Sequence, residues 1–356
     1  MKHAIILGIL LLLVPSLQGQ DRKAYVLHGH NGTSDKLQNM VSALNSTHKL
    51  AAEAFNYQSS DGIAQAGNDA RSKMSGSNSL AIGHSMGGIT LRQIDKQGGA
   101  PFSAAITVGT PHHGAEIARS LESGLAKNTT DKVTANIMAG PSRCPAVSFV
   151  NMLAVLGTGK DLTMMIQNLI GSKLSERSNQ SSKELQPDAA FFQGNQNTTV
   201  PFVSIATYED RNAAYRLAAS DKNMDQGTAV TIAHGAGYAW MAMGVFYTVR
   251  GIKSPWTLPL NIARANAWFT GGAQLLYWTE RDWNMLYAGV RTSDSMGDGF
   301  ITAASQTFAN AVGKIVVEDE GINHAEQRHH PRVFDEIRDV MESRGRYGHT
   351  FNVARR

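Results

Sequence analysis

The amino-acid sequence predicts an α/β fold with a mostly parallel, doubly wound sheet and helices on both faces. Short apolar runs alternate along the chain with stretches in which apolar residues recur every three or four positions. Several of the apolar runs end in glycine-containing loops. Strands that alternate with helices form parallel sheets that helices cover on both sides.

The expected elements follow this alternation in order. The expected strands are residues 23–28, 54–57, 79–82, 104–108, 200–207 and 314–318. The expected helices are residues 34–44, a polar helix ending near residue 72, residues 87–96 and residues 333–341. We therefore expect residues 20–356 to form a single domain on one sheet.

Two long segments interrupt the alternation and are expected to be helical lid or cap insertions. The first covers about residues 114–186 and is rich in apolar residues and methionine, which suits a flexible cover over an acyl chain. A plain helical cap explains this segment equally well. The second covers about residues 210–295 and carries all five tryptophans. Because tryptophan prefers the boundary between membrane and water, we expect a transient contact with a lipid interface, although an enlarged buried cap remains an alternative.

The N-terminus has the layout of a secretory signal peptide. Lys2 precedes an uncharged apolar run at residues 4–14, which Pro15 and Ser16 interrupt. The run is shorter than the roughly 20 residues that a spanning helix needs, although an uncleaved membrane anchor remains an alternative. We expect residues 1–19 to be removed and the mature protein to be secreted or periplasmic.

Composition excludes several other classes of protein. A chain of 356 residues with 42% hydrophobic and 17% charged residues is expected to fold around a large core rather than to be disordered. The formal net charge of +4 comes from scattered residues, so no nucleic-acid partner is predicted. Cys144 is the single cysteine and forms neither an internal disulfide nor a cysteine metal site. No cofactor or metal motif is found, and none is predicted.

The segment Gly83-His84-Ser85-Met86-Gly87 predicts a nucleophile elbow. It lies between an expected strand and an expected helix, which is the context that this pattern requires. The sharp turn puts the serine into a strained backbone conformation, so residues two positions away must be small. The turn also places the hydroxyl beside a helix N-terminus, where negative charge is favoured. Ser85 is therefore the predicted nucleophile.

The loop after the first expected strand predicts an oxyanion hole. In folds with this elbow, one backbone N–H comes from an early loop and one from the residue after the nucleophile. His28-Gly29-His30 supplies the early loop, which points to the N–H groups of His30 and Met86. The His30 side chain need not take part.

Three motifs together resemble a known family. Residues 26–30 (Val-Leu-His-Gly-His), 83–88 (Gly-His-Ser-Met-Gly-Gly) and 109–114 (Gly-Thr-Pro-His-His-Gly) are similar to motifs of bacterial triacylglycerol lipases and their esterase relatives, within the α/β-hydrolase superfamily. Residues 185–188 and 200–205 are also similar to that family. The resemblance implies the α/β-hydrolase fold with helical lid or cap insertions and activity on carboxylic esters.

A serine nucleophile needs a histidine base that a carboxylate orients, and in this fold the chain order is serine, acid, histidine. His324 follows the last expected strand in a glycine-containing loop and is the predicted base. His329 and His330 precede a proline at a helix start and are expected at the surface. His234 lies in an apolar helical stretch and is expected to be a hydrogen-bonded core residue.

The acid is assigned through the resemblance. Residues 297–301 (Gly-Asp-Gly-Phe-Ile) resemble the motif that carries the family's triad aspartate, which implies Asp298. Asp210 is an alternative because it comes soon after an expected strand, and Asp294 is a third candidate.

These residues predict a secreted serine hydrolase of carboxylic esters that acts through an acyl-enzyme, with triacylglycerols or related lipid esters as the expected substrate class. An acyltransferase, a peptidase or a polyester depolymerase could use the same triad. A non-catalytic lipid-binding protein on a hydrolase scaffold is the alternative from a different class.

Overall fold

The structure is a computed structural model, and it describes residues 21–143, 178–194, 196–209, 212–221, 225–294, 296–318 and 321–356. The predicted signal peptide lies outside the described residues. So do the middle of the predicted lid at residues 144–177, with Cys144, and the alternative acid Asp210.

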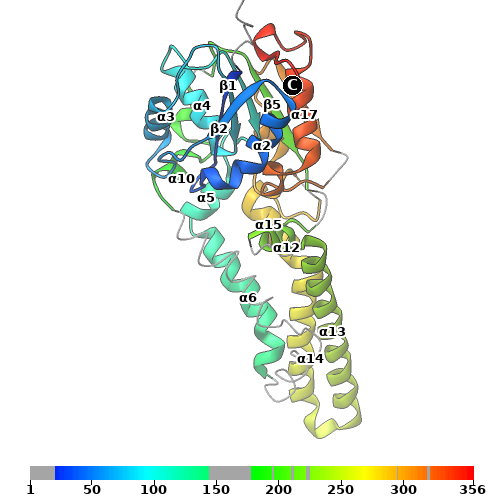
Figure 1. Cartoon of the computed structure of the whole chain (residues 1–356). Helices are drawn as coiled ribbons and strands as arrows, with labels where there is room; N and C mark the ends of the chain where they lie inside the picture. The colour runs from blue at the N-terminus through cyan, green and yellow to red at the C-terminus, as the bar shows by residue number, and fades with distance from the viewer. Residues whose placement is uncertain are drawn as a thin grey trace, which may run out of the picture.

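A single sheet of six strands forms the centre of the chain, in the order β2-β1-β3-β4-β5-β6 (Figure 1). The strands are β1 (Arg22–Leu27), β2 (Leu50–Ala54), β3 (Leu80–His84), β4 (Ala104–Val108), β5 (Phe202–Thr207) and β6 (Gly313–Val317). Every pairing in this described sheet is parallel. The predicted α/β fold with a mostly parallel sheet is confirmed.

Helices cover both faces of the sheet, as predicted. Along β1 the side chain of Val26 packs into one apolar cluster and that of Leu27 into another, because successive residues of a strand point to opposite faces. The first cluster includes residues of α2 (Gln38–Thr47) and α17 (Pro331–Met341). The second includes residues of α3 (Ile63–Ser72) and α4 (Met86–Lys96).

One expected strand is misplaced. Residues 54–57 were expected to be a strand, whereas β2 ends at Ala54. Tyr57 is buried as part of a loop, where its ring stacks on His28 at 4.3 Å between centroids and its hydroxyl donates to the His28 carbonyl. The aromatic residues of this stretch therefore anchor a loop beside the end of β1.

The remaining helices belong to the two insertions and to the loops at the sheet edge. Before β5 they are the 3₁₀ turn η1 (Ser34–Leu37), α5 (Glu116–Glu122), α6 (Leu125–Arg143), α10 (Gln180–Glu184) and α11 (Ala190–Gln193). After β5 they are α12 (Ala213–Asp221), α13 (Gln226–Lys253), η3 (Pro255–Thr257), α14 (Leu258–Ala273), the π-helical η4 (Gln274–Trp278), α15 (Thr279–Ala288), α16 (Ala303–Gln306), η5 (Glu326–Arg328) and η6 (His349–Phe351).

Helices α6, α13 and α14 extend away from the sheet as an arm (Figure 1). Helices α13 and α14 are joined by the short η3 turn and pack closely, because small residues lie between them. A Cβ atom on Gly244 would lie 2.6 Å from the Phe269 ring, and one on Gly271 would lie 2.8 Å from the Trp240 ring. The Trp240 and Trp268 rings meet edge to face at 5.7 Å. The arm thus has a packed interior of its own.

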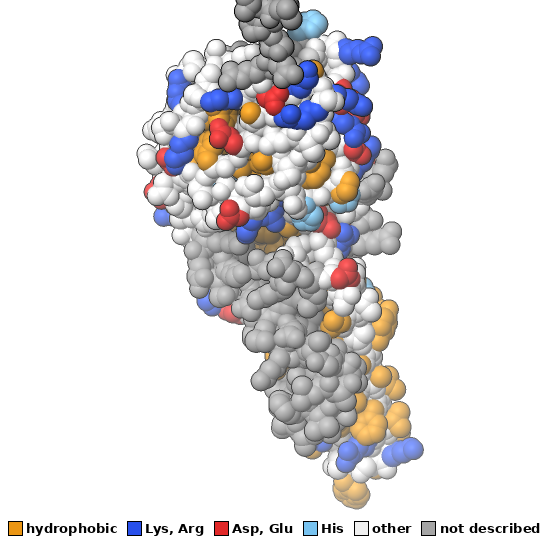
Figure 2. Space-filling model, viewed as in Figure 1, with side chains coloured by type: hydrophobic (Ala, Val, Ile, Leu, Met, Phe, Trp, Pro, Cys, Tyr) orange, Lys and Arg blue, Asp and Glu red, His pale blue; other side chains and the backbone are white. Residues whose placement is uncertain are grey.

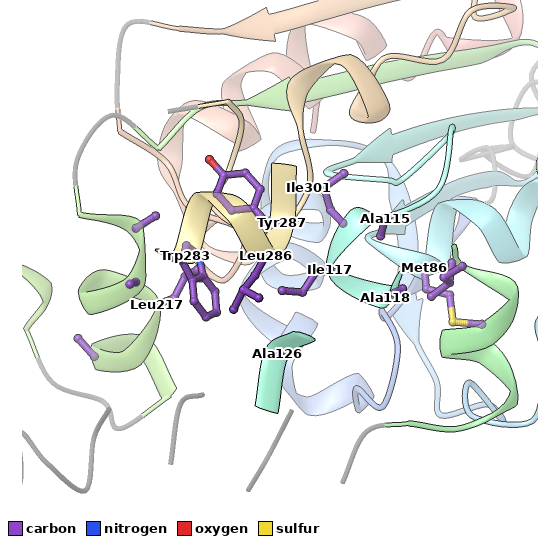
Figure 3. Packing of buried hydrophobic residues seen from close by; sticks show 14 of the residues in the cluster. Met86, Ala115, Ile117, Ala118, Ala126, Leu217, Trp283, Leu286, Tyr287 and Ile301 are labelled. Atoms are coloured by element: carbon purple, nitrogen blue, oxygen red, sulfur yellow. The ribbon is translucent and has the colours of Figure 1, made fainter. Parts of the chain in front are cut away.

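The base of the arm joins the sheet through α5, α12 and α15. Figure 3 shows Ile117 and Ala118 of α5, Ala126 at the start of α6, and Leu286 of α15 in one buried apolar cluster. Leu217 of α12 belongs to the same cluster. The base therefore continues the core on one face of the sheet.

The five tryptophans have different environments. Trp240, Trp268 and Trp283 are buried, whereas Trp256 in η3 is 96% exposed. Three of the tryptophans that suggested a lipid-facing surface therefore build the interior, Trp278 is half-buried, and Trp256 is the one tryptophan that is exposed. None of the described helices is long and apolar enough to cross a bilayer.

Candidate active site

The turn between β3 and α4 has the geometry of the predicted elbow. Ser85 has a φ of 57° and a ψ of −131°, a conformation that costs energy for a residue with a side chain. Its N–H donates to the carbonyl of Val108 on the neighbouring strand β4, which fixes the turn at the sheet edge. A Cβ atom on Gly83 would lie 2.5 Å from the backbone nitrogen of Gly88, so the turn requires glycine there.

The structure brings Ser85, His324 and Asp298 together in one chain of hydrogen bonds. The Nε2 atom of His324 lies 2.9 Å from Ser85 Oγ, and its Nδ1 atom lies 2.7 Å from Asp298 Oδ2. Because a carboxylate only accepts hydrogen bonds, Nδ1 carries the proton in this arrangement. The Nε2 lone pair is then directed at the Ser85 hydroxyl.

The carboxyl group of Asp298 is completely buried and fully hydrogen-bonded. Its Oδ1 accepts from the N–H groups of Phe300 and Ile301, at 2.9 and 2.7 Å. The turn that supplies these donors is held by Trp283, whose Nε1 donates to the Gly299 carbonyl at 2.7 Å. A buried carboxylate needs such partners, because an unpaired buried charge is costly.

The other candidates from the sequence lie elsewhere. Asp294 is exposed, and its contact with Asn284 runs through its backbone carbonyl. His329 is exposed, and His330 caps the N-terminus of α17. His234 lies in α13, and its Nε2 has no hydrogen-bond partner among the described residues, so the expected hydrogen bond at that atom is absent.

Sequence reasoning missed Gln327, which contacts the same group of residues. Its Nε2 donates to Asp298 Oδ2 at 2.8 Å and to Thr207 Oγ1 at 2.7 Å. The oxygen of Asp298 that faces His324 therefore has a second donor. Gln327 lies three residues after His324, in the η5 turn, but its residue type alone gives no signal for this role.

His84, the second residue of the elbow motif, is a neutral neighbour of His324. Its Nε2 lies 3.0 Å from the His324 carbonyl and 3.1 Å from Gln327 Oε1, so Nε2 carries its proton. Burial, followed by repulsion from His324 and Arg328, lowers the pKa of His84 well below its ordinary value. The ring of His84, 4.8 Å from that of His324, thus adds no positive charge beside it.

The loop after β1 approaches the Ser85 hydroxyl closely. A Cβ atom on Gly29 would lie 2.7 Å from Ser85 Cβ and 3.0 Å from its Oγ, so only glycine fits there. The next residue, His30, directs its ring to Asn179, with Nε2 2.9 Å from Oδ1. Met86 is the first residue of α4, where N–H groups have no acceptor within the helix.

A cavity of about 690 Å³ adjoins this group of residues. Ser85, His30 and His324 line it together with apolar side chains, among them Ile117, Leu121, Leu185, Leu217 and Phe300. The last of these also stacks on His324, with ring centroids 5.6 Å apart. The cavity therefore offers an apolar wall next to the serine hydroxyl.

Arg216 of α12 connects the base of the arm with the His324 loop. Its guanidinium contacts Glu209 Oε1 at 2.8 Å, Glu326 Oε2 at 3.2 Å and the Gly321 carbonyl at 3.1 Å. Glu326 in turn accepts from the N–H of Asn323, the residue before His324. Arg216 thus holds the His324 loop at two points, one before His324 at Gly321 and one after it at Glu326.

The described residues contain no cluster of three or more side chains that could hold a metal ion. The site as described consists of the protein's own hydroxyl, imidazole, carboxylate and amide groups.

Comparisons with known proteins give low similarity. No protein-family model matches the chain. Similar solved structures include the mature form of the Bacillus licheniformis lipase BlEst2, with 13% identity, coverage of 91% of this chain and 93% of that one, and a TM-score of 0.49. Another is the metagenomic carboxyl esterase MGS0156, with 11% identity, coverage of 86% of this chain and 65% of that one, and a TM-score of 0.38. A third is Est816, described as an N-acyl homoserine lactone degrading enzyme, with 9% identity, coverage of 90% of this chain and 92% of that one, and a TM-score of 0.38.

The fold assignment rests on the chain's own topology. An open parallel sheet carries a strained serine at the sharp turn between β3 and α4, and Asp298 and His324 follow it in chain order. This is the arrangement of the α/β-hydrolase fold. The chain therefore has the α/β-hydrolase fold.

Proposed function

We propose that the protein is a serine hydrolase of carboxylic esters, with Ser85 as nucleophile, His324 as base and Asp298 as the acid that orients it. The observation that carries this proposal is the unbroken hydrogen-bond chain from Ser85 Oγ through both nitrogens of His324 to Asp298. In this chain the carboxylate of Asp298 fixes the tautomer of the His324 imidazole, and the imidazole accepts the proton of the Ser85 hydroxyl.

The proposed reaction proceeds in two halves. Ser85 Oγ attacks the ester carbonyl while His324 Nε2 takes the hydroxyl proton, and the N–H groups of His30 and Met86 stabilise the oxyanion. His324 then protonates the leaving alcohol, which leaves the acyl group on Ser85. A water molecule, deprotonated by the same Nε2, attacks this acyl-enzyme. The bond between the acyl carbon and Ser85 Oγ breaks, Nε2 returns the proton to Oγ, and the carboxylic acid is released. The His84 ring supports the transient imidazolium by remaining neutral next to it.

The proposed substrates are hydrophobic esters, with lipid esters as the favoured class. This part of the proposal is supported by the apolar cavity wall next to Ser85, to which α5 and α12 contribute. Burying an acyl chain against such a wall contributes about 0.8 kcal/mol per methylene. We also propose export of the protein, on the basis of the N-terminal apolar run.

A fluorophosphonate probe tests the nucleophile. The wild-type protein is expected to be labelled, Ser85→Ala to be unlabelled, and Ser46→Ala, which changes an exposed serine on α2, to be labelled like the wild type. Equal labelling of Ser85→Ala and the wild type would refute the assignment.

A series of p-nitrophenyl esters from acetate to palmitate tests the substrate class. We expect kcat/KM to rise with acyl length. A sharp optimum at acetate would contradict the lipase proposal and leave a short-chain esterase. Product analysis with an added alcohol distinguishes hydrolysis from acyl transfer, because a transferase would give mainly the new ester.

A further inference from the structure

The free end of the arm is the most apolar exposed region among the described residues. We call residues 245–262, which include the end of α13, η3 and the start of α14, the tip. More than half of the exposed large hydrophobic side chains among the described residues lie on it. They are Val245, Phe246, Val249, Ile252, Trp256, Leu260 and Ile262. Such a concentration marks an interaction surface, whereas scattered single residues do not.

The charge of the arm selects the kind of partner. Between Asp225 and Glu280 the sequence has three basic residues and no acidic one. Arg264 lies over the Tyr247 ring within the arm, so its charge is used internally. Arg250 and Lys253 lie on the tip itself, both exposed, in the last turn of α13. Figure 2 shows basic side chains beside hydrophobic ones at the end of the arm.

We propose that the tip docks on the surface of an anionic lipid membrane. Exposed apolar side chains, a tryptophan and lysine or arginine without acidic neighbours are the combination that binds such surfaces. Trp256 has an amphipathic ring that favours the boundary between lipid and water and, at 96% exposure, has no role in the packing of the arm.

An alternative reading of Arg250 and Lys253 is that they only compensate the negative end of the α13 dipole. That reading explains two cations at a helix C-terminus. It explains neither the absence of acidic residues throughout α13, η3 and α14 nor the exposed apolar residues around the same cations. An anionic lipid surface accounts for all three features.

The geometry indicates a tether rather than a lid. Helix α13 has 28 residues, which gives an arm of about 42 Å at 1.5 Å per residue. The Ser85 cavity lies at the other end, where Leu217 and Gln226 at the arm base contribute to its wall. Docking of the tip therefore holds the protein near the membrane without covering the cavity, and the proposal does not depend on what Ser85 does.

Co-sedimentation with vesicles tests the proposal. The full chain is incubated with vesicles of equal parts phosphatidylglycerol and phosphatidylcholine, and with phosphatidylcholine alone. We expect binding to the anionic vesicles only. Trp256→Ala is expected to weaken this binding about tenfold, and Arg250→Gln with Lys253→Gln about twenty-fivefold, since each cation contributes about fivefold.

Matched controls change an exposed residue of the same kind on the sheet-containing part of the chain. Val312→Ala and Lys49→Gln are expected to bind like the wild type. Turnover of soluble p-nitrophenyl acetate, or fluorophosphonate labelling, is expected to stay within twofold in the tip variants, which shows that they are folded. If the wild-type protein bound anionic vesicles but did not react with the fluorophosphonate, the proposed function would be refuted and the membrane-docking proposal would stand.

Two outcomes would overturn the proposal. The first is equal binding of the wild type and the tip variants to anionic vesicles. The second is no vesicle binding combined with a dimer in analytical ultracentrifugation that Trp256→Ala dissociates, which would assign the tip to a second copy of this chain.

Discussion

The sheet and the arm are built from different kinds of contact. In the sheet, β1 lies between β2 and β3, and β6, near the end of the chain, pairs with β5, so segments distant in sequence are brought together. In the arm, α13 and α14 are sequence neighbours that pack through glycine and tryptophan. The sheet brings together the side chains of Ser85, Asp298 and His324 from distant parts of the chain. The exposed apolar surface of the arm, in contrast, comes from one continuous segment, residues 245–262.

The largest expected effect tests the chemistry that the sheet assembles. Asp298→Asn is expected to lower kcat by about 10⁴-fold, because the amide no longer fixes the productive imidazole tautomer. Hydrolysis of a p-nitrophenyl ester measures the effect. The matched control is Asp294→Asn, an exposed neighbour of the same type, which is expected to keep wild-type activity. Unchanged turnover in Asp298→Asn, with loss in Asp294→Asn or Asp210→Asn, would move the acid to that residue.

The second prediction concerns the junction between arm and sheet. Burial raises the pKa of Glu280 to about 7, although N–H groups of Ala213 and Ala214 stabilise its anion. The ordinary pKa of a glutamate is 4.5. Between pH 4.5 and about 7, Glu280 therefore keeps its proton in the folded chain, whereas it has released it in the unfolded chain. The free energy of unfolding therefore falls as pH rises through this range, by about 3 kcal/mol in total.

Glu280→Gln tests this junction because it keeps an acceptor and removes the titration. We expect the variant to be more stable than the wild type at pH 8 and to lack this part of the pH dependence, as measured by urea unfolding. An identical pH profile in both proteins would show that Glu280 does not titrate in this range.

The third prediction concerns Gln327, which supports Asp298 without contacting Ser85. Gln327→Met keeps the side-chain volume but removes the donor to Asp298 Oδ2. Losing a hydrogen bond to a charged group costs about 1.5–3 kcal/mol, so kcat is expected to fall about ten- to a hundredfold. KM is expected to stay constant, since Gln327 does not line the cavity. A change in KM alone would assign Gln327 to substrate binding instead.

The smallest effect tests whether the arm is an independent packing unit. Gly244→Val inserts a side chain against Phe269 and is expected to destabilise α13 and α14 by about 1–3 kcal/mol. Gly235→Val is the matched control on the same helix, because no atom lies within 4 Å of the new Cβ position. Hydrogen exchange is expected to accelerate in the arm of Gly244→Val and to stay unchanged in β3 and β4. Equal acceleration in both regions would indicate one cooperative unit.

The sheet and the Ser85 turn were predictable because their sequence signals are local. Strands β3 and β4 are short apolar runs that end in glycine-containing loops, and the elbow needs small residues at fixed positions. The sequence also identified the three residues that the structure brings together in a hydrogen-bond chain. Their catalytic role stays a proposal.

The arm and the supporting residues were less predictable, for physical reasons. Apolar residues occur around the whole circumference of α13, so no stripe indicates which face meets α14. Clustered tryptophans did not reveal that Trp240 and Trp268 pack on each other. Gln327 contacts Asp298, and His84 contacts His324, only when segments distant in sequence come together in the fold. No local pattern in the sequence indicates these contacts.

The hydrogen bond between Ser85 and His324 joins residues 239 positions apart in the chain. Contacts of this separation form late in folding, whereas neighbouring helices pair early, because closing a long loop must precede the gain from its contacts. During refolding from urea, helical circular dichroism from the arm is therefore expected to return before reactivity with a fluorophosphonate. The reactivity of Ser85 with the fluorophosphonate would therefore report when β6 has joined the sheet.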